Sequence, residues 1–516
     1  MRQEILKFCM EKGLLLDKEA LNLFSDFDNE TAKKIIDKIS SLKERVITKS
    51  FLTKNVGKIQ NLIEDEKIID KLKINFGVSV EISRERYIEK QGADFGGLGN
   101  LKIIYSLANL TKKLEPADFV HYFRGRYNEV KGLLQDRKEL ENLSSVNKIN
   151  GQRQAVSIIG IVFDKRVTKN KNILLEIEDL SGRITVLVNK TKGDIYEKAK
   201  DIVVDDIIGI KCFGNREILF ANEIVYPDAY LDEKNKIDRD EKAVFISDIH
   251  IGSTCFLENN FQKFIKWVNG EVGDDKQKQE ALKVKYIFIT GDSIDGVGVF
   301  PGQDVMLNIK DIKKQYEKLA EFLSLIRKDI KIIICPGQHD AVRVAEPQPF
   351  IGRDYGEALY SLNNVILVSN PAIVEIKNEN GKRGMKILMY HGASMNPLIN
   401  EIETLRLGKA HDNPARVIKE MLKRRHLASL HSAVSYIPIK DQDPLLIREV
   451  PDIIATGDLH KPDIDVYNNI LIIASSCWQS ITPFEEKVGN HPDPCKVPVL
   501  NLSTREIKIL DFGDEK

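Results

Sequence analysis

Five segments of the chain share one arrangement, in which a short apolar run ends directly before acidic and histidine residues. The runs are Ala243–Ser247, Tyr286–Thr290, Lys331–Cys335, Lys386–Tyr390 and Asp452–Thr456. Such runs predict buried strands, and the helical patterns between them, clearest over 311–327, predict an α/β fold. Because α/β proteins assemble their sites at the carboxyl ends of strands, the arrangement predicts one site built from distant parts of the chain.

The residues that follow these runs belong to types that bind metal ions. They are Asp248 and His250 in SDIHIGS, Asp292 in TGDSIDG, Gln338, His339 and Asp340 in PGQHD, His391 in YHG, and Asp458 and His460 in TGDLH. Of the nine histidines in the chain, four stand in these segments. One Asp-x-His after a strand is more often a turn than a ligand pair, but five such segments in order argue for a single site.

Phosphodiester hydrolysis is a reaction that suits such a residue set. Negative charge gathers on the phosphate oxygens in the transition state, and two cations ~3.5–4 Å apart can stabilise it and supply a hydroxide nucleophile. Ligands that mix imidazole with carboxylate and amide oxygens suit manganese, iron or zinc better than calcium. The segments therefore predict two divalent metal ions, Mn²⁺ first, with Fe, Zn or Mg as alternatives.

The chain is 516 residues long, which predicts more than one domain. Residues 1–45 carry apolar residues at helical spacing and predict a small helical N-terminal domain. Residues 46–100 are hydrophilic and contain GGLG, which lacks the Lys-Ser/Thr of a phosphate-binding loop, so they predict a flexible linker. Residues 101–152 predict a helical connector, with a helix from about 116 to 143.

Residues 153–228 predict a small β domain. The β-rich runs are Val156–Phe163, Ile173–Ile177, Arg183–Val188, Ile207–Cys212 and Ile218–Val225, with a helix near Gly193–Lys200. Five strands with a helix between the third and fourth is the order of an OB-fold. Its aromatic residues, Phe163, Phe213 and Phe220, are sparse, which favours a structural or subunit-contact role over binding of single-stranded nucleic acid.

The composition limits the classes of function. Lys+Arg and Asp+Glu both number 77, so any DNA contact must come from a local patch or from a partner. The basic stretch around His426 and His431 is one such patch, although a solvated helix face is the plainer interpretation. The six cysteines lack CxxC spacing, which argues against a disulfide framework or a zinc ribbon. Without a signal peptide or a membrane-spanning run, a cytoplasmic location is expected.

Longer segments narrow the family. The set DxH, GD, GNHD, HG and GHxH marks calcineurin-like metallophosphoesterases, and the chain is similar to that set. The stretches SDIHIGS, GDSIDGVGVFPGQ, PGQHDAVRVAEPQP, EVPDIIATGDLH and SSCWQSITPF resemble the small subunit of archaeal family D DNA polymerases. The resemblance covers residues 100–516 well and the N-terminal region loosely. It implies a multidomain α/β plus β protein, with a calcineurin-like metallophosphoesterase sandwich over residues 241–516, an OB-fold over 153–228 and a small helical N-terminal domain.

The same resemblance implies a role for each site residue. A first metal would be held by Asp248, His250, Asp292 and His460. A second would share Asp292 and be completed by Gln338, His391 and Asp458. His339 would act as the general acid or as a donor to the leaving group, with Asp340 orienting it. The implied activity is a 3′-5′ exonuclease that removes mismatched nucleotides from a DNA primer 3′ end, for a polymerase whose large catalytic subunit is a separate chain.

Two positions depart from the family motif, and both map to the second metal. Gln338 stands where Asn is usual, and Asp458 stands where the first His of GHxH is usual. Either the second site is retuned, with Asp458 favouring a harder cation, or it is failing and the chain is a scaffold that stabilises the large subunit. The survival of the other motif residues favours retained hydrolysis. A stand-alone phosphoesterase remains a further alternative, but it would not need an OB-fold.

Several residues near the motifs keep a structural and a functional interpretation open. Asp295, Phe300 and Gln303 match the family but can simply shape a Gly-rich loop. Trp478 and Phe484 are expected to anchor a core or a subunit interface rather than to stack on a base.

Overall fold

The computed structural model describes residues 2–16, 21, 32–33, 36–37, 46–48, 99–107, 114–379, 381–439 and 442–514. The chain divides into two compact units, Met1–Lys90 and Gln91–Lys516. In the first unit, helix α1 spans Arg2–Glu11, and strands β1 (Leu15–Leu16) and β2 (Val46–Ile47) pair in parallel. Most of the predicted helical domain and of the predicted linker lies outside the described residues.

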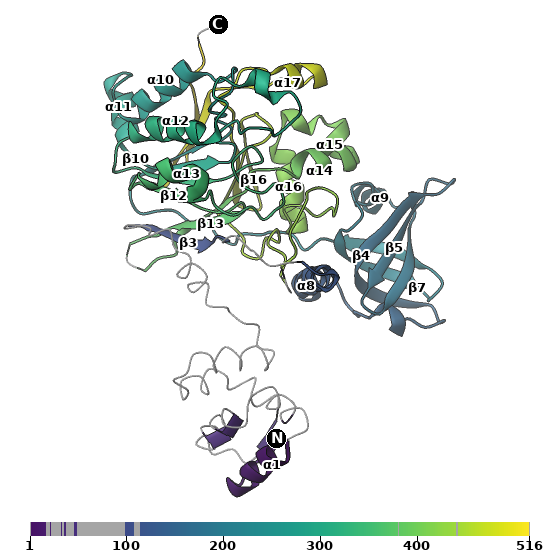
Figure 1. Ribbon diagram of the computed structural model, residues 1–516. Helices are drawn as coiled ribbons and strands as arrows, with labels where there is room; N and C mark the ends of the chain where they lie inside the picture. The colour runs from purple at the N-terminus through teal and green to yellow at the C-terminus, as the bar shows by residue number, and fades with distance from the viewer. Residues whose placement is uncertain are drawn as a thin grey trace. The chain divides into compact units, whose positions relative to one another are not determined.

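Two six-stranded sheets form the α/β part of the second unit (Figure 1). The first sheet has the order β12-β11-β10-β9-β18-β19. Its strands are β9 (Lys242–Ile246), β10 (Val284–Thr290), β11 (Lys331–Cys335), β12 (Val365–Leu367), β18 (Lys496–Asn501) and β19 (Ile507–Asp511). Strands β9 to β12 are parallel, so their carboxyl ends share one edge.

The second sheet has the order β16-β17-β15-β14-β13-β3. Its strands are β3 (Leu101–Tyr105), β13 (Ala372–Ile376), β14 (Met385–Met389), β15 (Ile453–Thr456), β16 (Asp463–Tyr467) and β17 (Ile470–Ala474). Strands β14, β15 and β17 are parallel. Strand β3 lies at the start of the predicted helical connector, residues 101–152, where it pairs antiparallel with β13. The helix of that region, α8, spans Pro116–Gln135.

Helices cover both sheets. They are α10 (Glu258–Val268), α11 (Asp275–Leu282), α12 (Ile312–Ser324) and α13 (Arg353–Tyr360) by the first sheet, α14 (Met395–Glu401), α15 (Glu403–Leu407) and α16 (Ala415–Arg424) by the second, and α17 (Pro483–Val488) beyond β17. Short 3₁₀ turns occur at Val146–Lys148, Gln303–Met306 and Ala410–Asp412.

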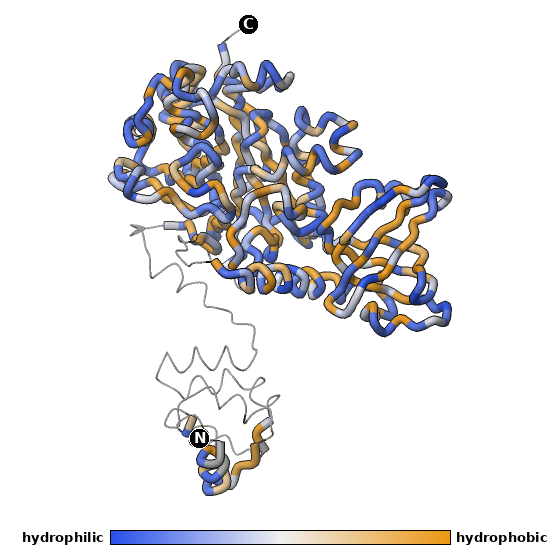
Figure 2. The backbone as a smooth tube through the Cα atoms, turned by 45° about the vertical axis from the view of Figure 1, so that its right-hand side comes forward, coloured by the Kyte–Doolittle hydropathy of each residue, from blue (hydrophilic) through white to orange (hydrophobic). Residues whose placement is uncertain are grey.

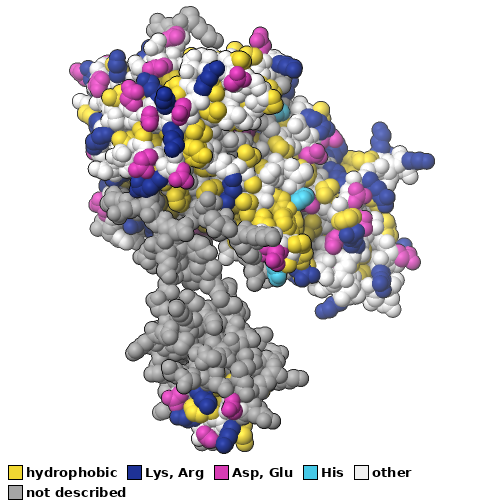
Figure 3. Space-filling view, viewed as in Figure 1, with side chains coloured by type: hydrophobic (Ala, Val, Ile, Leu, Met, Phe, Trp, Pro, Cys, Tyr) yellow, Lys and Arg dark blue, Asp and Glu magenta, His cyan; other side chains and the backbone are white. Residues whose placement is uncertain are grey.

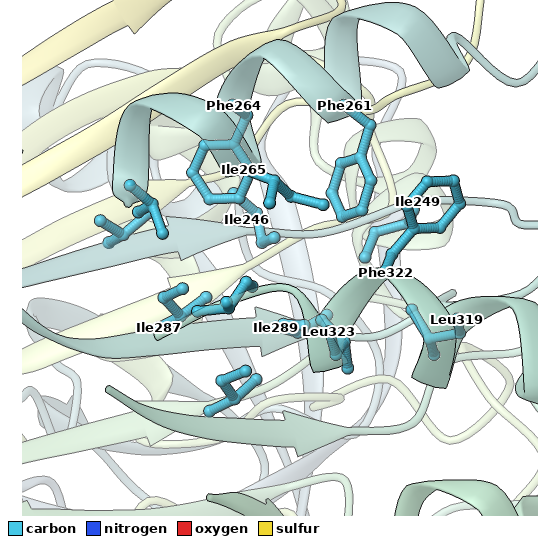
Figure 4. Packing of buried hydrophobic residues seen from close by; sticks show 14 of the residues in the cluster. Ile246, Ile249, Phe261, Phe264, Ile265, Ile287, Ile289, Leu319, Phe322 and Leu323 are labelled. Atoms are coloured by element: carbon cyan, nitrogen blue, oxygen red, sulfur yellow. The ribbon is translucent and has the colours of Figure 1, made fainter. Parts of the chain in front are cut away.

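The apolar runs of the sequence are the buried strands of this arrangement. Figure 4 shows Phe261 and Phe264 of α10 and Phe322 of α12 packed towards the strand residues Ile246, Ile287 and Ile289. The alternate residues of the same strands, Phe245 and Phe288, stack on each other with ring centroids 5.2 Å apart. A strand buried on both faces has a continuous apolar sequence, and Figure 2 shows such hydrophobic segments inside the molecule. Trp478 belongs to this core, as predicted.

Residues 154–225 form a closed five-stranded barrel with the order β4-β5-β6-β8-β7. Its elements are β4 (Gln154–Val167), β5 (Ile173–Asp179), β6 (Gly182–Val188), α9 (Gly193–Lys200), β7 (Ile207–Gly214) and β8 (Leu219–Val225). Every strand and the helix predicted for this region are present. Phe213 and Phe220 are exposed neighbours on β7 and β8, whereas the Arg183 guanidinium lies 3.5 Å from the centroid of the exposed Phe163 ring.

Arg424, Arg425 and His426 at the end of α16 are buried, which corrects the prediction of a solvated helix face there, whereas His431 is exposed. His426 Nε2 lies 2.8 Å from Asp443 Oδ2 in the interior. Arg424 connects the α/β part to the barrel region: its Nε donates to Asp206 Oδ1 at 2.9 Å and its Nη2 to the Asp201 carbonyl at 2.6 Å. The basic residues there satisfy buried acceptors and leave little charge for DNA.

Replacement of Arg424 by methionine is expected to destabilise the protein by about 3–5 kcal/mol, because it leaves a buried carboxylate without its countercharge. Asp206 is only 1% exposed, so water cannot replace the guanidinium. Thermal and urea unfolding measure the loss. The double variant Arg424→Met with Asp206→Asn should recover part of it, since the two residues are coupled. Equal losses in the single and double variants would contradict this pairing.

The surface carries both charges. On the face shown in Figure 3, Lys and Arg are interspersed with Asp and Glu, in keeping with the 77 residues of each sign. All six cysteines are free thiols, and Cys255 is the one that is not fully buried. Within the described part of the chain, no helix has both the length and the apolarity needed to cross a membrane.

Candidate metal centre

Five strands bring the predicted site residues to one place. In the order β9, β10, β11, β14 and β15, the residues just after each strand are Asp248 with His250, Asp292, Gln338 with His339, His391, and Asp458 with His460. The first three strands belong to one sheet and the last two to the other. The backbone N–H of Asp458 donates to Asp248 Oδ2 at 3.1 Å and so connects the two sheets. The centre lies where the carboxyl ends of both sheets meet.

Potential ligand atoms of these residues form three overlapping groups, each within 4.8 Å. The groups are Asp248–His250–His460, His250–Asp292–His339 and Asp248–Asp292–His391. Asp458 joins them, since its Oδ1 lies 3.9 Å from His391 Nε2, and Gln338 contacts Asp458. Every predicted metal ligand is therefore part of one cluster, and Asp248, His250 and Asp292 are each shared by two groups.

The four histidine rings are held in the same way, through Nδ1. The contacts are His250 Nδ1 to Asp295 Oδ1 at 3.0 Å, His339 Nδ1 to the Asp295 carbonyl at 2.8 Å, His391 Nδ1 to the Thr290 carbonyl at 2.8 Å, and His460 Nδ1 to Glu485 Oε1 at 2.8 Å. A proton on each Nδ1 satisfies these acceptors and leaves Nε2 towards the centre. This is the usual arrangement of metal-binding histidine.

Two of the residues that hold the rings have no sequence signal for that role. Asp295 appears only as a loop residue in the sequence, yet its carboxylate contacts His250 and its carbonyl contacts His339. Glu485 lies in the first turn of α17, where it also completes a capping box with Thr482. The capping pattern predicts a helix start, and the contact to His460 depends on how α17 packs against the loop after β15.

Unsatisfied polar atoms in the centre provide a test of whether a metal fits. Within the described residues, four buried atoms of the predicted ligands make no well-directed hydrogen bond: Asp248 Oδ1, His250 Nε2, Gln338 Oε1 and His391 Nε2. Two of them still lie at ion-pair distance, His391 Nε2 at 3.2 Å from Asp292 Oδ2 and Asp248 Oδ1 at 3.3 Å from His460 Nε2. An unpaired buried polar atom costs ~1–3 kcal/mol. Imidazole nitrogens and carboxylate and amide oxygens together suit a transition-metal dication. The donor set fits divalent metal ions.

Backbone strain is concentrated at the same residues. Five predicted ligands have positive φ, namely Asp248 (50°), His250 (54°), Asp292 (47°), Asp458 (68°) and His460 (55°). Each such residue costs on the order of 1–3 kcal/mol, and strain of this kind collects at functional sites. Because this strain lowers stability, its presence at five neighbouring residues indicates that these residues serve a function.

Glycines in the motifs allow the ligand side chains to approach the backbone. A Cβ atom at Gly337 would lie 2.1 Å from Asp292 Oδ1, and one at Gly291 would lie 2.2 Å from His391 Nδ1. No larger residue fits at either position unless a ligand side chain moves. The glycines of GD and PGQ are therefore part of the site geometry.

The buried carboxylates of the centre need positive charge nearby. Burial raises the pKa of Asp292, but His391, with Nε2 at 3.2 Å from Oδ2, outweighs it and holds that pKa well below its ordinary value. Burial lowers the pKa of His391, but Asp292 and then Asp248 raise it well above the usual range. Burial raises the pKa of Asp458 to about 6. Protons on the histidines, or metal ions, can supply the positive charge that these carboxylates need.

Asp340 does not take the predicted role of orienting His339. Its carboxylate accepts hydrogen bonds from the backbone N–H of Gly337 at 2.9 Å, the backbone N–H of Ser293 at 3.2 Å and the Tyr316 hydroxyl at 3.0 Å. The Asp340 side chain turns towards the backbone of its own loop and of the loop after β10, and so anchors the two loops to each other. The His339 ring is oriented by the Asp295 carbonyl instead.

The two residues that depart from the family motif contact each other. Gln338 Nε2 donates to Asp458 Oδ1 at 2.9 Å, while Gln338 Oε1 is one of the unsatisfied atoms. Asn396 Nδ2 approaches Asp458 Oδ2 at 3.4 Å. The longer amide reaches the shorter carboxylate, so the two departures from the family motif are in direct contact.

Comparison with known proteins identifies relatives over most of the chain. The family of the B subunits of DNA polymerases alpha and epsilon matches residues 243–464. The DNA polymerase II small subunit of Methanothermobacter thermautotrophicus is 37% identical over 77% of this chain and 80% of its own length. That of Archaeoglobus fulgidus is 35% identical over 83% of this chain and 84% of its own length. That of Pyrococcus furiosus is 37% identical, and the match spans 64% of its length.

Solved structures give a weaker similarity. A novel archaeal phosphodiesterase is 14% identical with a TM-score of 0.26, over 52% of this chain and 98% of that one. A Vps29 single mutant from Entamoeba histolytica is 14% identical with a TM-score of 0.24, over 52% of this chain and 89% of that one. At these TM-scores, the site assignment depends on the geometry of this chain's own residues.

Proposed function

The chain belongs to the DNA polymerase II small-subunit family, and from that membership we propose that it is the proofreading subunit of a heteromeric archaeal replicative DNA polymerase. Its activity would be a metal-dependent 3′-5′ exonuclease, and its partners a large catalytic subunit and the primer 3′ end. One observation supports this above all. The predicted ligands come from two sheets into one strained, buried cluster whose unsatisfied atoms suit metal ions.

The proposed ligand sets are those that the family resemblance implies. The first metal would be held by Asp248, His250, Asp292 and His460, and the second by Asp292, Gln338, His391 and Asp458. Two divalent cations, Mn²⁺ first, supply a hydroxide-like nucleophile and stabilise the charge on the phosphate when bound. The side chains Asp295 and Glu485 fix the rings of His250 and His460, so the ligands need little rearrangement.

His339 would protonate the departing 3′ oxygen of the DNA. Its ring lies edge-on to that of His250, with centroids 4.8 Å apart, and its Nδ1 is bound to the Asp295 carbonyl. The protonated ring then presents Nε2–H to the leaving group, which is how a general acid lowers the barrier to bond cleavage. Asp340 would act only by anchoring the loop that carries His339.

For the remaining domains, we propose an OB-fold over residues 153–228 and a helical N-terminal domain over residues 1–45. The barrel order β4-β5-β6-β8-β7, with α9 between the third and fourth strands, supports the OB-fold. Its exposed aromatics do not form one continuous surface, which favours a role in subunit contact over a role in base stacking. A calcineurin-like metallophosphoesterase sandwich is the corresponding proposal for residues 241–516.

A scaffold without activity is the main alternative, and the strained backbone of the proposed ligands argues against it. Strain at five ligands costs stability, so a chain that no longer bound metal would gain by relaxing it. A stand-alone phosphoesterase would act on small esters without a partner. Co-purification with a large polymerase chain would support the proposed subunit and argue against a stand-alone phosphoesterase.

The proposed function is tested with the full chain assembled with its large subunit and a 5′-labelled primer that ends in a mismatch. We expect stepwise loss of nucleotides from the 3′ end with Mn²⁺, faster than from a matched end, and no loss in the presence of a chelator. Asp248→Ala in the same assembly is the control. If the wild-type assembly cleaved no faster than this variant with manganese, iron or magnesium, the proposed exonuclease activity would be excluded.

The Gln338–Asp458 pair gives a separate prediction. Asp458→His alone is expected to slow Mn²⁺-supported cleavage about 10–100-fold, because it removes the acceptor of the Gln338 amide and places a second imidazole beside His391. Adding Gln338→Asn should restore activity, since Asn is the usual partner of His in this family. Rates over an Mn²⁺ titration measure both effects. A single variant as active as the wild type would show that the pair has no role.

A further inference from the structure

A loop beside the candidate metal centre carries exposed apolar side chains. In this loop, residues 296–302 with the sequence GVGVFPG, the side chains Val297, Val299 and Phe300 are all exposed. Three of its glycines, Gly296, Gly298 and Gly302, have positive φ, which lets the chain reverse direction without losing contact with the site. Exposed apolar residues gathered beside a site commonly mark a binding surface.

The loop is held firmly rather than left to move. At its start, Gln315 binds Gly296 through both ends of its amide, at 2.8 Å and 3.0 Å. At its end, Gln303 donates to the Asp295 carbonyl at 2.8 Å and to Asp295 Oδ2 at 2.9 Å, and accepts from the backbone N–H of Val299 at 2.9 Å. Both glutamines are buried. The buried side-chain amides of Gln303 and Gln315 thus fix a loop whose apolar tip is exposed to solvent.

The fixed tip lies next to the residue proposed to protonate the leaving group. Phe300 is 36% exposed, and the centroid of its ring is 6.4 Å from that of the His339 ring, at an interplanar angle of 63°. A Cβ atom at Gly296 would lie 2.3 Å from the His339 carbonyl oxygen, so the two loops touch through their backbones. A phosphodiester held at the metal centre would carry its adjoining nucleoside within reach of Phe300.

We propose that Phe300 is a stacking platform for an unpaired nucleobase next to the cleaved phosphodiester. This rests on the proposed nuclease function and names its substrate class, a DNA 3′ end whose terminal base is out of the duplex. Aromatic side chains stack on any base at ~1–3 kcal/mol each, without sequence preference. Val297 and Val299 extend the apolar surface beside the ring. A terminal mismatch frees its base more readily than a pair does, so the platform favours mismatched ends.

The test compares a single-stranded oligonucleotide that ends in a normal 3′ nucleotide with one that ends in an abasic 3′ nucleotide. In the assembly with the large subunit, we expect the wild type to cleave the normal end about 10-fold faster, as one base stack allows. Phe300→Ala should slow cleavage of the normal end to the abasic rate and leave the abasic rate unchanged. Phe300→Leu keeps the volume without the ring and should behave like alanine, whereas Phe300→Trp should retain the preference.

Tyr355→Ala is the matched control, because Tyr355 is an aromatic side chain that is 46% exposed on α13. It should alter neither rate. A loss in Phe300→Ala that is equal for both ends would overturn the proposal, as would a loss explained by failure to co-purify with the large subunit, since the loop would then be a subunit contact.

A binding measurement separates this proposal from the hydrolytic function. A 3′-terminal 2-aminopurine oligonucleotide is titrated with protein in the presence of chelator, where cleavage does not occur. Quenching that depends on Phe300 supports stacking even if the protein proves to have no nuclease activity. Quenching that is equal in the wild type and Phe300→Ala overturns the stacking proposal and leaves the nuclease proposal standing.

Discussion

Replacement of Asp292 by asparagine is expected to lower the rate of 3′-end cleavage by at least ~10³-fold. Asp292 is the residue common to both proposed metal sites, and its atoms take part in two of the three ligand groups. Its Oδ1 also accepts the backbone N–H of His339 at 2.8 Å, and its Oδ2 lies 3.2 Å from His391 Nε2. Metal ions supply several kcal/mol of transition-state stabilisation, and about 4 kcal/mol corresponds to that loss.

The loss of cleavage rate in Asp292→Asn should be accompanied by a loss of bound metal, which can be measured. Asparagine keeps the shape and the hydrogen bond to His339 but removes the charge that two cations would share. The number of Mn²⁺ ions bound per chain should therefore fall along with the rate. Paramagnetic resonance of free Mn²⁺ and single-turnover cleavage report the two quantities separately.

Asp295→Asn provides the matched control, because it makes the same change at a buried carboxylate 3.0 Å from His250 Nδ1. Asp295 orients a ligand without being one, so this variant should lose only about 10–100-fold. If the two variants lost equal activity and equal metal, Asp292 would not be a shared ligand. Retained co-purification with the large subunit shows that either variant is folded.

Much of the framework could be predicted from the sequence because its strands are buried on both faces. The runs before Asp248, Asp292 and His391 are mostly apolar, and each strand ends within one residue of the end of its run. The barrel strands were predictable for a related reason, since their inward residues alternate with outward ones. Strand β16, with the sequence DIDVY, was not predicted. It lies at a sheet edge and is only partly buried, so its sequence can contain polar residues and lacks a continuous apolar run.

Contacts made by tertiary packing were not predictable. Arg424 and Asp206 are 218 residues apart, and nothing in either segment indicates that they pair. The basic run on α16 has the composition of a solvated face, yet its arginines satisfy acceptors in the interior. Likewise, the family resemblance implied that Asp340 orients His339, but neighbouring side chains in a loop point in different directions, and the Asp295 carbonyl contacts the His339 ring instead.

The second large effect is expected at His339. Replacement by alanine should slow cleavage by about 10²–10⁴-fold, the range for loss of a positioned general acid, while metal binding stays unchanged. The ring is fixed by the Asp295 carbonyl at 2.8 Å and lies beside His250, so its removal takes away a proton donor without disturbing the carboxylates that would bind the cations. This pattern differs from that of Asp292→Asn, where rate and metal fall together.

A substrate whose leaving group needs no proton makes this prediction decisive. An oligonucleotide with sulfur in place of the bridging 3′ oxygen at the last linkage releases a thiolate, so the acid has nothing to contribute. His339→Ala should cleave it nearly as fast as the wild type, whereas Asp292→Asn should remain slow on both substrates. His431→Ala, which changes an exposed histidine bound to Tyr436, is the control and should alter neither rate. A His339→Ala loss that is equal for oxygen and sulfur would assign the ring to positioning or metal binding, because only proton transfer depends on the basicity of the departing atom.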